Sequence, residues 1–530
     1  MLALVAAAAA VVVAARIGGT SEHDSRRIAR GAPRHRAAGG AHVVPMTLTP
    51  GAATRPLLRA PVTVTLGRGE VRIPRSYLGL STEYWAMPAF ERQMGQFERM
   101  LSMVRVSGNG PLILRIGGDS TDHALYNVNI GRAPKGIFEL RQTWFRQASS
   151  VVETVDARTL LDLNLVSDLP RMAAQWARAA QAQLPAGTII GYEVGNEPDL
   201  YNPWYWSALF GPIARVLDIR LFPRRLTPET YVALYHAYAR VLATFAPGVP
   251  LVAPVIAYPT TNLKWISTLL EAPHPALGLI SAHMYPYSAC ASPLSPEYPS
   301  IAKILGETAT AGMASSLEPA IALAHGAGLP FRLTELNSVT CGGVPGISNT
   351  FATALWAPDA LFELARAGVD GVNIHVRAFA INAAFAPVKD RLVARPLFYG
   401  LVLFARTLGP DPQLVPLQVE SAPPGLKVWG VRVLGNVVHV LLINKGAGST
   451  TVDLRLTLAG AATVQRLLAP SSAARSGVTL DGQHLGPDDT WVGRAATETV
   501  RAGAGGYMVP VPGTSAALVT AQLAAGTVSP

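Results

Sequence analysis

Cysteine and charge are both scarce in this sequence. Only two of the 530 residues are cysteines, Cys290 and Cys341, and only 15% are charged. The sequence has no cluster of His and Cys with metal-ligand spacing, and no glycine-rich loop of the kind that cradles phosphates. We therefore expect neither a metal site nor a nucleotide cofactor. The apolar fraction of 49% is enough to bury a large core.

The positive charge is concentrated at the N-terminus. The formal net charge is +10, and residues 1–60 hold eight Arg and only two acidic residues. The rest of the chain is mildly basic and shows no basic face interleaved with aromatic residues, so a nucleic-acid partner is not expected. We interpret residues 1–60 as a signal or anchor segment followed by a basic linker.

Residues 2–15 are almost wholly apolar. This run is shorter than the roughly 20 residues of a membrane span and fits the apolar region of a signal peptide, although no positive residue precedes it. We expect a secreted or extracytoplasmic protein, with this segment either cleaved or kept as an N-terminal anchor. The alternative is an apolar terminus without a targeting role.

The cysteine count fits an exported protein with a single disulfide. Cys290 and Cys341 both follow predicted strands that would be neighbours in a sheet. We therefore expect a bridge between them; the alternative is a pair of buried thiols.

Short apolar segments alternate with helical ones through most of the chain. We expect helices over stretches such as 168–183, 228–245, 317–326 and 358–368. Eight strand–helix units in this order predict an α/β fold, a (β/α)8 TIM barrel. The eight expected strands are 77–84, 112–116, 160–166, 189–194, 251–256, 279–284, 331–336 and 371–376.

The pattern changes to period two after about residue 410. Segments 428–434, 437–444 and 451–456 alternate apolar and polar residues and are separated by turn signals. They predict a C-terminal antiparallel β-sandwich domain. Residues 61–75 contain strands that come before the barrel and are expected to join that sandwich. The expected division is therefore 1–60, 61–75, 76–408 for the barrel and 409–530 for the sandwich.

Two glutamates stand at the ends of expected barrel strands. Glu197 lies in Gly191-Tyr192-Glu193-Val194-Gly195-Asn196-Glu197-Pro198, after strand four, and Glu335 ends strand seven. Barrel enzymes place their chemistry at this C-terminal rim. A retaining glycosidase needs one carboxylic acid to protonate the leaving oxygen and one carboxylate to attack the anomeric carbon, about 5–5.5 Å apart. We predict Glu197 as the acid/base and Glu335 as the nucleophile; the alternative for each is a rim salt bridge.

From about Val62 onward, the chain resembles glycoside hydrolase family 79, which contains β-glucuronidases and heparanase-like enzymes. The resemblance implies that Asn196 binds the sugar 2-hydroxyl and that Tyr285 donates a hydrogen bond to Glu335. It also implies that Glu83, Asp119 and His283 line the subsite of the cleaved sugar. Each of these could instead be a structural polar residue. The motifs that carry the resemblance are Tyr77-Leu78-Gly79-Leu80-Ser81-Thr82-Glu83, Leu114-Arg115-Ile116-Gly117-Gly118-Asp119, Gly195-Asn196-Glu197-Pro198, His283-Met284-Tyr285 and Thr334-Glu335-Leu336-Asn337-Ser338 followed by Gly342-Gly343.

The sequence departs from the family where the substrate carboxylate would be held. Family members use tyrosine hydroxyls and a glycine-rich turn for this purpose. Thr340 stands at one tyrosine position, and a loose alignment puts Phe385 at the other, while the turn glycines Gly342 and Gly343 remain. Arg377, just after strand eight, is a charged donor that could replace the tyrosines, or an ordinary ion-pair partner.

Aromatic residues just after Glu197 and just after the first expected strand are candidate platforms for sugar faces, with ordinary packing as the alternative. They are Tyr84, Trp85, Tyr201, Trp204, Tyr205 and Trp206.

The sequence thus predicts a retaining exo-β-glycosidase, β-glucuronidase-like, with a glycoside or oligosaccharide as its partner. The first alternative is a β-glucosidase, a β-xylosidase or an endo-acting polysaccharide hydrolase. The second is a carbohydrate-binding protein without catalysis.

Overall fold

The computed structural model describes most of the chain after the N-terminal segment. It covers residues 62–67, 69–106, 108–126, 137–202, 225–456, 458–503 and 506–524. The expected signal segment and linker, and the aromatic residues Trp204, Tyr205 and Trp206, lie outside these ranges. Within these ranges, the helices are all too short or too polar to cross a membrane.

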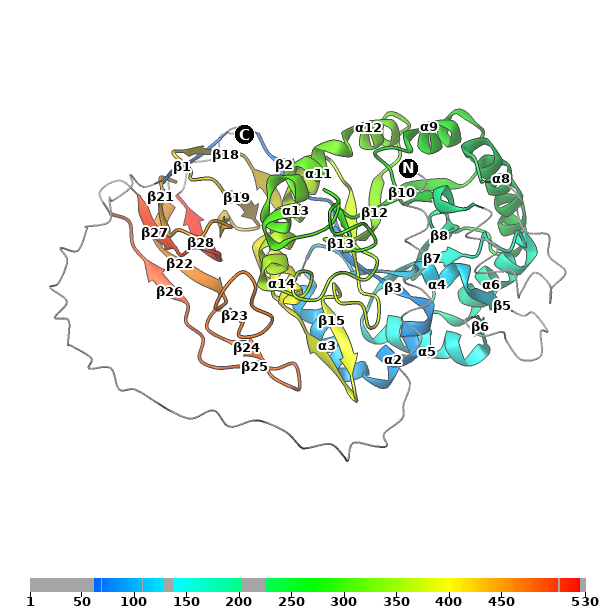
Figure 1. Cartoon of the computed structure of the whole chain (residues 1–530), viewed down its shortest axis with the longest axis horizontal. Helices are drawn as coiled ribbons and strands as arrows, with labels where there is room; N and C mark the ends of the chain where they lie inside the picture. Colours follow the sequence, from blue (N-terminus) through cyan, green and yellow to red (C-terminus); the bar gives the residue numbers. More distant parts are fainter. Residues whose placement is uncertain are drawn as a thin grey trace, which may run out of the picture.

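A closed barrel of eight strands forms the larger part of the structure (Figure 1). Neighbouring strands are parallel throughout, in the order β10-β12-β14-β3-β4-β7-β8-β9. The predicted (β/α)8 barrel is therefore confirmed. The strands are β3 (Leu78–Glu83), β4 (Ile113–Gly117), β7 (Arg158–Leu163), β8 (Ile189–Val194), β9 (Leu251–Ile256), β10 (Leu277–Met284), β12 (Phe331–Leu336) and β14 (Gly371–His375).

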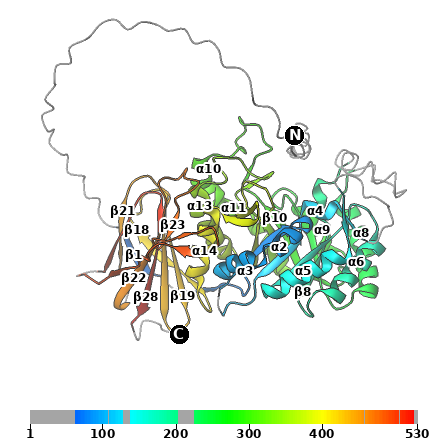
Figure 2. The same ribbon diagram turned by 90° about the horizontal axis from the view of Figure 1, so that it is seen from below.

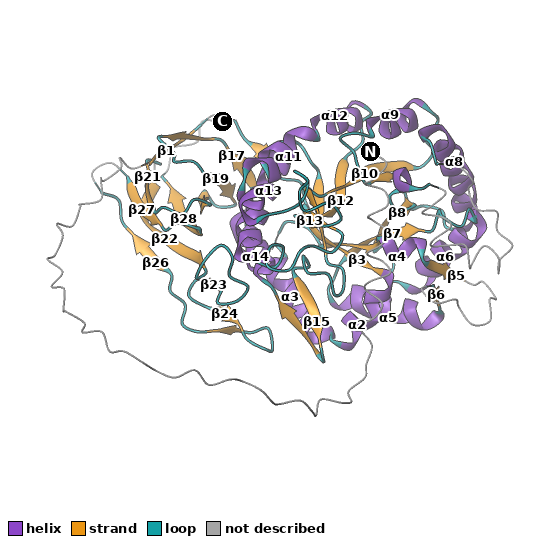
Figure 3. Ribbon diagram, in the orientation of Figure 1, coloured by secondary structure: helices purple, strands orange, loops and turns teal. Residues whose placement is uncertain are grey.

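Helices surround the barrel strands (Figure 3). They are α2 (Met87–Arg92), α3 (Met94–Val104), α4 (Asp119–Asp122), α5 (Gln142–Thr154), α6 (Pro170–Gln183), α8 (Pro228–Phe245), α9 (Leu263–Glu271), α10 (Ile301–Leu305), α11 (Ala311–Ser316), α12 (Glu318–Gly326), α13 (Phe351–Arg366) and α14 (Pro396–Leu408).

Two boundaries differ from the sequence prediction for identifiable reasons. The third strand ends at Leu163 because the Asn164 side chain donates to the Thr121 and Ala124 carbonyl oxygens and turns the chain toward the preceding loop. Helix α13 begins at Phe351, not at Pro358 as expected. The helix continues through Pro358 because every residue from Phe351 to Ala365 is buried, and this burial outweighs the helix-breaking effect of proline.

The C-terminal part consists of mainly antiparallel sheets beside the barrel, as predicted. One sheet has the order β18-β1-β21-β27 and the other runs β2-β17-β19-β20-β28-β22-β23. The strands are β1 (Val62–Leu66), β2 (Val71–Arg72), β17 (Gln413–Val415), β18 (Leu417–Glu420), β19 (Leu426–Val433), β20 (Val437–Asn444), β21 (Thr450–Leu454), β22 (Leu458–Leu468), β23 (Thr479–Leu480), β26 (Glu498–Val500), β27 (Tyr507–Val511) and β28 (Ser515–Leu523).

The strands that come before the barrel pair with strands from the end of the chain. β1 is antiparallel to β18 and parallel to β21, and β2 pairs with β17. Val62 and Val64 of β1 belong to the same buried cluster as Val440, Leu442 and other residues of the C-terminal sheets. This pairing supports the proposed assignment of residues 61–75 to the C-terminal domain.

Helices α13 and α14 lie between the barrel and the C-terminal sheets (Figure 2). A buried polar contact crosses this interface: Asp359 of α13 pairs with Lys445 and accepts a hydrogen bond of 2.9 Å from Trp429 Nε1. The Trp429 ring also stacks on Phe362, with centroids 5.4 Å apart. The two parts of the chain therefore share one hydrophobic and electrostatic interface.

We expect Asp359→Ala to lower the free energy of unfolding by about 3–5 kcal/mol, because it leaves the Lys445 ammonium buried without a counter-charge. The double change Asp359→Leu with Lys445→Met should restore most of the loss, since it removes both charges together. Urea unfolding of the three proteins measures this. If Asp359→Ala had the same free energy of unfolding as the wild type, the prediction would be wrong.

Candidate active site

The site is built at the C-terminal rim of the barrel, where several strands deliver polar side chains to one place. Glu197 follows β8, Glu335 is the last residue but one of β12, and His283 comes from β10. One carboxylate oxygen of each glutamate and one ring nitrogen of His283 all lie within 4.8 Å of one another. This spacing is close to the separation of about 5–5.5 Å that a retaining glycosidase needs.

Glu197 is held by its backbone in a sparsely populated conformation. Its φ and ψ are 49° and 51°, in the left-handed region, and its amide donates to the Val255 carbonyl at 2.9 Å. A non-glycine residue held in this region costs about 1–3 kcal/mol, and such strain clusters at functional sites. The side chain is 24% exposed, and its Oε1 lies 2.9 Å from His283 Nδ1. Glu197 is therefore fixed but accessible.

Glu335 is surrounded by donors. The Tyr285 hydroxyl donates to Oε2 at 2.8 Å, and Arg115 Nη1 donates to Oε1 at 2.5 Å. His375 Nδ1 lies 3.6 Å from Oε1. Burial alone would raise the pKa of Glu335, but the positive charges of His375, His283 and Arg115 and the hydrogen bond from Tyr285 hold it well below its usual value. Glu335 is therefore ionised, as an attacking carboxylate must be.

Arg115 of β4 is the centre of a fully buried charge network. Besides Glu335, it binds Glu193 Oε2 at 2.5 Å, Asp162 Oδ2 at 3.0 Å and Asn196 Oδ1 at 3.0 Å. Burial would lower the pKa of Arg115, but the nearby carboxylates raise it well above the ordinary value. Burial also raises the pKa of Asp162 well above its usual range.

Sequence reasoning did not assign a role to this network. Arg115, Glu193 and Asp162 occupy buried positions on barrel strands, and His375 ends β14. The available signal was an arginine between Leu114 and Ile116 in an otherwise apolar strand, since a charge is buried only with partners.

Asn196 lies next to the two glutamates. Its Oδ1 accepts the hydrogen bond from Arg115, so the amide is oriented with Nδ2 as its donor. A donor at this point suits an interaction with a sugar hydroxyl, which is the role expected for Asn196.

Glu83, Asp119 and Arg377 form a second cluster beside Glu335. Arg377 Nη2 donates to Asp119 Oδ2 at 3.0 Å, and Nε lies 3.5 Å from Glu83 Oε1. Gly118 brings this cluster close to Glu335: a Cβ at Gly118 would lie 3.1 Å from Glu335 Oε1 and 3.2 Å from the Glu83 carboxylate, and its φ of 70° also favours glycine. Arg377 is 35% exposed and is thus the accessible cation of this cluster.

The turn expected to bind the substrate carboxylate lies in the segment that follows β12. Thr340 belongs to a short strand, β13 (Val339–Thr340), and Gly342 follows with φ of 78°. The Gly342 carbonyl accepts from the Ile381 amide at 2.7 Å, which ties this turn to the loop after β14. The role of Thr340 and Gly342 in substrate binding remains a prediction.

Phe385 does not line the site. It lies in β15 (Phe385–Val388), which pairs with β16 (Arg391–Ala394), and its ring is buried against Phe90, Phe97 and Phe398. The loose alignment of Phe385 with a substrate-binding tyrosine thus points to a residue whose ring packs in the core. Its apolar ring is needed for the core instead.

Two of the expected aromatic platforms are also core residues. Tyr84 is fully buried against Trp144 and Trp176 and donates to the Asp162 carbonyl. Tyr201 is buried and donates to Asp122 Oδ1 at 2.6 Å. Because each hydroxyl finds an internal acceptor, both rings are used for packing. Trp85 is partly exposed, and Arg377 lies over its ring.

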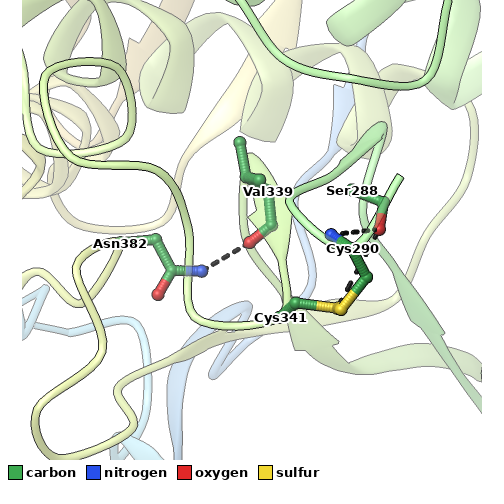
Figure 4. Close-up of a disulfide and its surroundings, with 5 residues drawn as sticks. All are labelled: Ser288, Cys290, Val339, Cys341 and Asn382. Carbon is green, nitrogen blue, oxygen red and sulfur yellow. Dashed lines mark hydrogen bonds between the residues drawn. A yellow bond between two sulfur atoms is a disulfide. The ribbon is translucent and has the colours of Figure 1, made fainter. Parts of the chain in front are cut away.

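Cys290 and Cys341 are joined by a disulfide (Figure 4). It links the loop after β10 to the turn after β12, the two strands that carry His283 and Glu335.

Glu197, His283 and Glu335 are also a donor set that could hold a metal ion. Two carboxylates and an imidazole are suitable ligands for Zn²⁺. Both oxygens of Glu335, however, already accept hydrogen bonds from protein donors, Arg115 and Tyr285.

His283 gives a direct test of this electrostatic arrangement. Burial would lower its pKa, but Glu335 and the hydrogen bond to Glu197 raise it above the ordinary value. We expect Glu335→Gln to lower the pKa of His283, because the largest opposing charge is lost. NMR titration of ring-labelled histidine measures the shift, with the exposed Glu271→Gln as control. An unchanged pKa of His283 would show that Glu335 does not act on it.

Comparison with known proteins agrees with the geometry. Residues 428–518 match the family model described as "Glycosyl hydrolase family 79 C-terminal beta domain". A β-glucuronidase of Aspergillus niger is 24% identical over 475 residues, covering 77% of this chain and 82% of the relative. A β-glucuronidase of Neurospora crassa is 24% identical over 553 residues, covering 84% and 93%.

Among solved structures, a 4-O-α-L-rhamnosyl-β-D-glucuronidase from Fusarium oxysporum has a TM-score of 0.69. It is 17% identical and covers 86% of this chain and all of that structure, which shows a shared fold. The fold and the matches define the chain as a glycoside hydrolase. The resemblance to glycoside hydrolase family 79 is confirmed.

Proposed function

We propose that this chain is a retaining exo-β-glycosidase of the β-glucuronidase type, with Glu197 as acid/base and Glu335 as nucleophile. The observation that carries the proposal is the spacing of the two carboxylates, whose nearest oxygens lie within 4.8 Å. An inverting enzyme needs a wider gap, about 6.5–9.5 Å, to admit water between them.

In the first step, Glu335 attacks the anomeric carbon while Glu197 donates its proton to the leaving oxygen. The bond between the anomeric carbon and that oxygen breaks, and a covalent ester between Glu335 and the sugar forms. In the second step, Glu197 takes a proton from water, and the water oxygen attacks the anomeric carbon. The ester bond breaks, and the sugar leaves with its original β configuration.

The surrounding residues stabilise charge as it develops. Arg115 and Tyr285 hold the Glu335 carboxylate ionised and aimed, while His283 holds Glu197. The amide of Asn196 is placed to bind the sugar 2-hydroxyl, a contact that strengthens in an oxocarbenium-like transition state.

The proposed substrate class is β-D-glucuronides. The relatives named β-glucuronidase support this choice. In this chain Arg377 is the charged donor that could bind the sugar carboxylate, together with Thr340 and Gly342, while Glu83 and Asp119 would accept from hydroxyl groups. The disulfide between Cys290 and Cys341 supports an extracytoplasmic site of action.

A panel of 4-nitrophenyl β-glycosides tests the substrate class. We expect the highest kcat/KM on the glucuronide, and NMR of the first product should show the β anomer. Arg377→Met should raise KM for the glucuronide more than for the glucoside, because only the glucuronide has a carboxylate to bind. Activity on the glucoside without activity on the glucuronide would overturn the substrate class and leave the chemistry intact.

A neutral β-glycoside is the second candidate. Arg377 already pairs with Asp119 and lies near Glu83, so its charge is largely balanced. With Thr340 in place of a tyrosine, the carboxylate would have fewer donors than in other family members. The same panel separates the two candidates.

A further inference from the structure

The disulfide closes an extension of the barrel that lies beyond the catalytic rim. Past Met284 and Leu336, β10 and β12 continue as two short parallel strands, β11 (Tyr287–Ser288) and β13 (Val339–Thr340), in which Tyr287 pairs with Val339 and Ser288 with Thr340. The Cys290–Cys341 bond lies directly after both strands (Figure 4). It therefore joins the outer ends of two strands whose inner ends carry catalytic groups.

The covalent path from this bond to the reacting groups is short. Cys290 follows Tyr285 by five residues, and Cys341 follows Glu335 by six. Tyr285 and Glu335 are themselves joined by the hydrogen bond of 2.8 Å from hydroxyl to Oε2. The disulfide and this hydrogen bond thus link the same two segments at opposite ends.

The two segments are not held equally by the rest of the protein. The segment with Cys341 is tied on its other side to the loop after β14, because Asn382 Nδ2 donates to the Val339 carbonyl at 2.5 Å (Figure 4) and the Gly342 carbonyl accepts from the Ile381 amide. Cys341 itself has a φ of 56°, which the flanking bonds hold in place. This segment is thus held on two sides, by the loop after β14 and by the disulfide.

The segment with Cys290 has a less extensive connection to the segment with Cys341. Strand β11 is only two residues long, and the Ser288 hydroxyl accepts from the Cys290 amide at 3.1 Å within its own loop and lies 3.9 Å from Cys341 Sγ. The barrel pairs His283–Glu335 and Met284–Leu336 hold the inner ends of the two segments, and the disulfide is the covalent link between their outer ends.

We infer that the Cys290–Cys341 disulfide is a positioning element that holds the Tyr285 hydroxyl on Glu335. The inference rests on the proposed function. When a dithiol reductant cleaves the bond, its two thiols supply two electrons and two protons. The protein then carries two cysteine thiols, and the reductant becomes a disulfide. The Tyr285 segment gains freedom, and the hydrogen bond that aims and stabilises the nucleophile is populated less.

The test compares four proteins on 4-nitrophenyl β-D-glucuronide: wild type, Tyr285→Phe, Cys290→Ser with Cys341→Ser, and the triple variant. A misplacement of about 1 Å costs on the order of 100-fold, so we expect the double serine variant to lose about 10- to 100-fold in kcat, with a smaller change in KM. In the Tyr285→Phe background, removing the disulfide should have little further effect on kcat, because the hydrogen bond that it positions is already absent.

Reduction of the folded wild type gives a second, independent measurement. Treatment with dithiothreitol should lower kcat of the wild type to the level of the double serine variant and have no effect on that variant. Mass labelling monitors the formation of the thiols. A double variant that fails to fold therefore leaves the inference testable.

The outcomes separate this inference from the proposed function. A wild type without glycosidase activity would overturn the proposed function. An active wild type whose kcat is unchanged by reduction and by the serine changes would overturn the inference alone. So would a loss that multiplies fully with that of Tyr285→Phe, since this would mean that the disulfide acts on stability and not through Tyr285.

Discussion

Replacing Glu335 with glutamine should lower kcat on 4-nitrophenyl β-D-glucuronide by a factor on the order of 10⁴ or more. The amide has nearly the same size, so the shape of the site is kept, and its single oxygen can still accept from one of the two donors, Arg115 or Tyr285. It has no negative charge, however, and cannot form the glycosyl ester. Steady-state kinetics measure the loss, and mass spectrometry of the wild type with a slow 2-fluoro substrate should find the label on Glu335.

The control for this change is Glu271→Gln, which removes the same charge at the exposed end of α9. That variant should keep wild-type kinetics. If Glu335→Gln retained more than about a hundredth of the wild-type kcat, the attacking group would be another residue, and the two-glutamate mechanism would be wrong.

The pH dependence of stability gives the same residue a second readout. The pKa of Glu335 is lowered in the folded protein, so its ionised form contributes stability that is present above the unfolded pKa of about 4.3. This contribution is lost as the pH falls toward the folded pKa. The advantage of wild type over Glu335→Gln in free energy of unfolding should therefore shrink below about pH 4.

The barrel and the two glutamates could be predicted because their signals are local. A parallel barrel strand is buried on both faces, so it forms a short apolar run such as that of β9, and parallel strands all end at one rim. A carboxylate near the end of such a strand, as at Glu335, or shortly after it, as at Glu197, is thereby placed without knowledge of any other contact.

The charge network around Arg115 could not be predicted in the same way. Its partners Asp162 and Glu193 come from β7 and β8, and which side chains meet inside a closed barrel depends on the stagger of the strands. Sequence shows only that a buried arginine needs partners. The same limit applies to Tyr84 and Tyr201, whose hydroxyl groups find acceptors that are distant in sequence.

The removal of Glu197 should have an effect that depends on the substrate. We expect Glu197→Ala to lower kcat/KM by about 10²- to 10⁴-fold on a glucuronide with a poor leaving group, because general acid catalysis is lost. On 2,4-dinitrophenyl β-D-glucuronide the loss should be much smaller, because that leaving group departs without a proton. In this variant, hydrolysis of the glycosyl ester should then limit kcat on this substrate, since no base activates water.

Azide should therefore restore turnover to Glu197→Ala on the activated substrate. As an anion, azide needs no base, and truncation of a side chain that is 24% exposed leaves an accessible space beside Glu335. It should attack the glycosyl ester from the face that Glu197 occupied and give the β-glucuronyl azide, which NMR identifies. Equal losses on both substrates without azide rescue would show that Glu197 acts only through the structure. The rescue product ties the role of Glu197 to its position, because a β azide forms only if Glu197 and Glu335 lie on opposite faces of the same sugar.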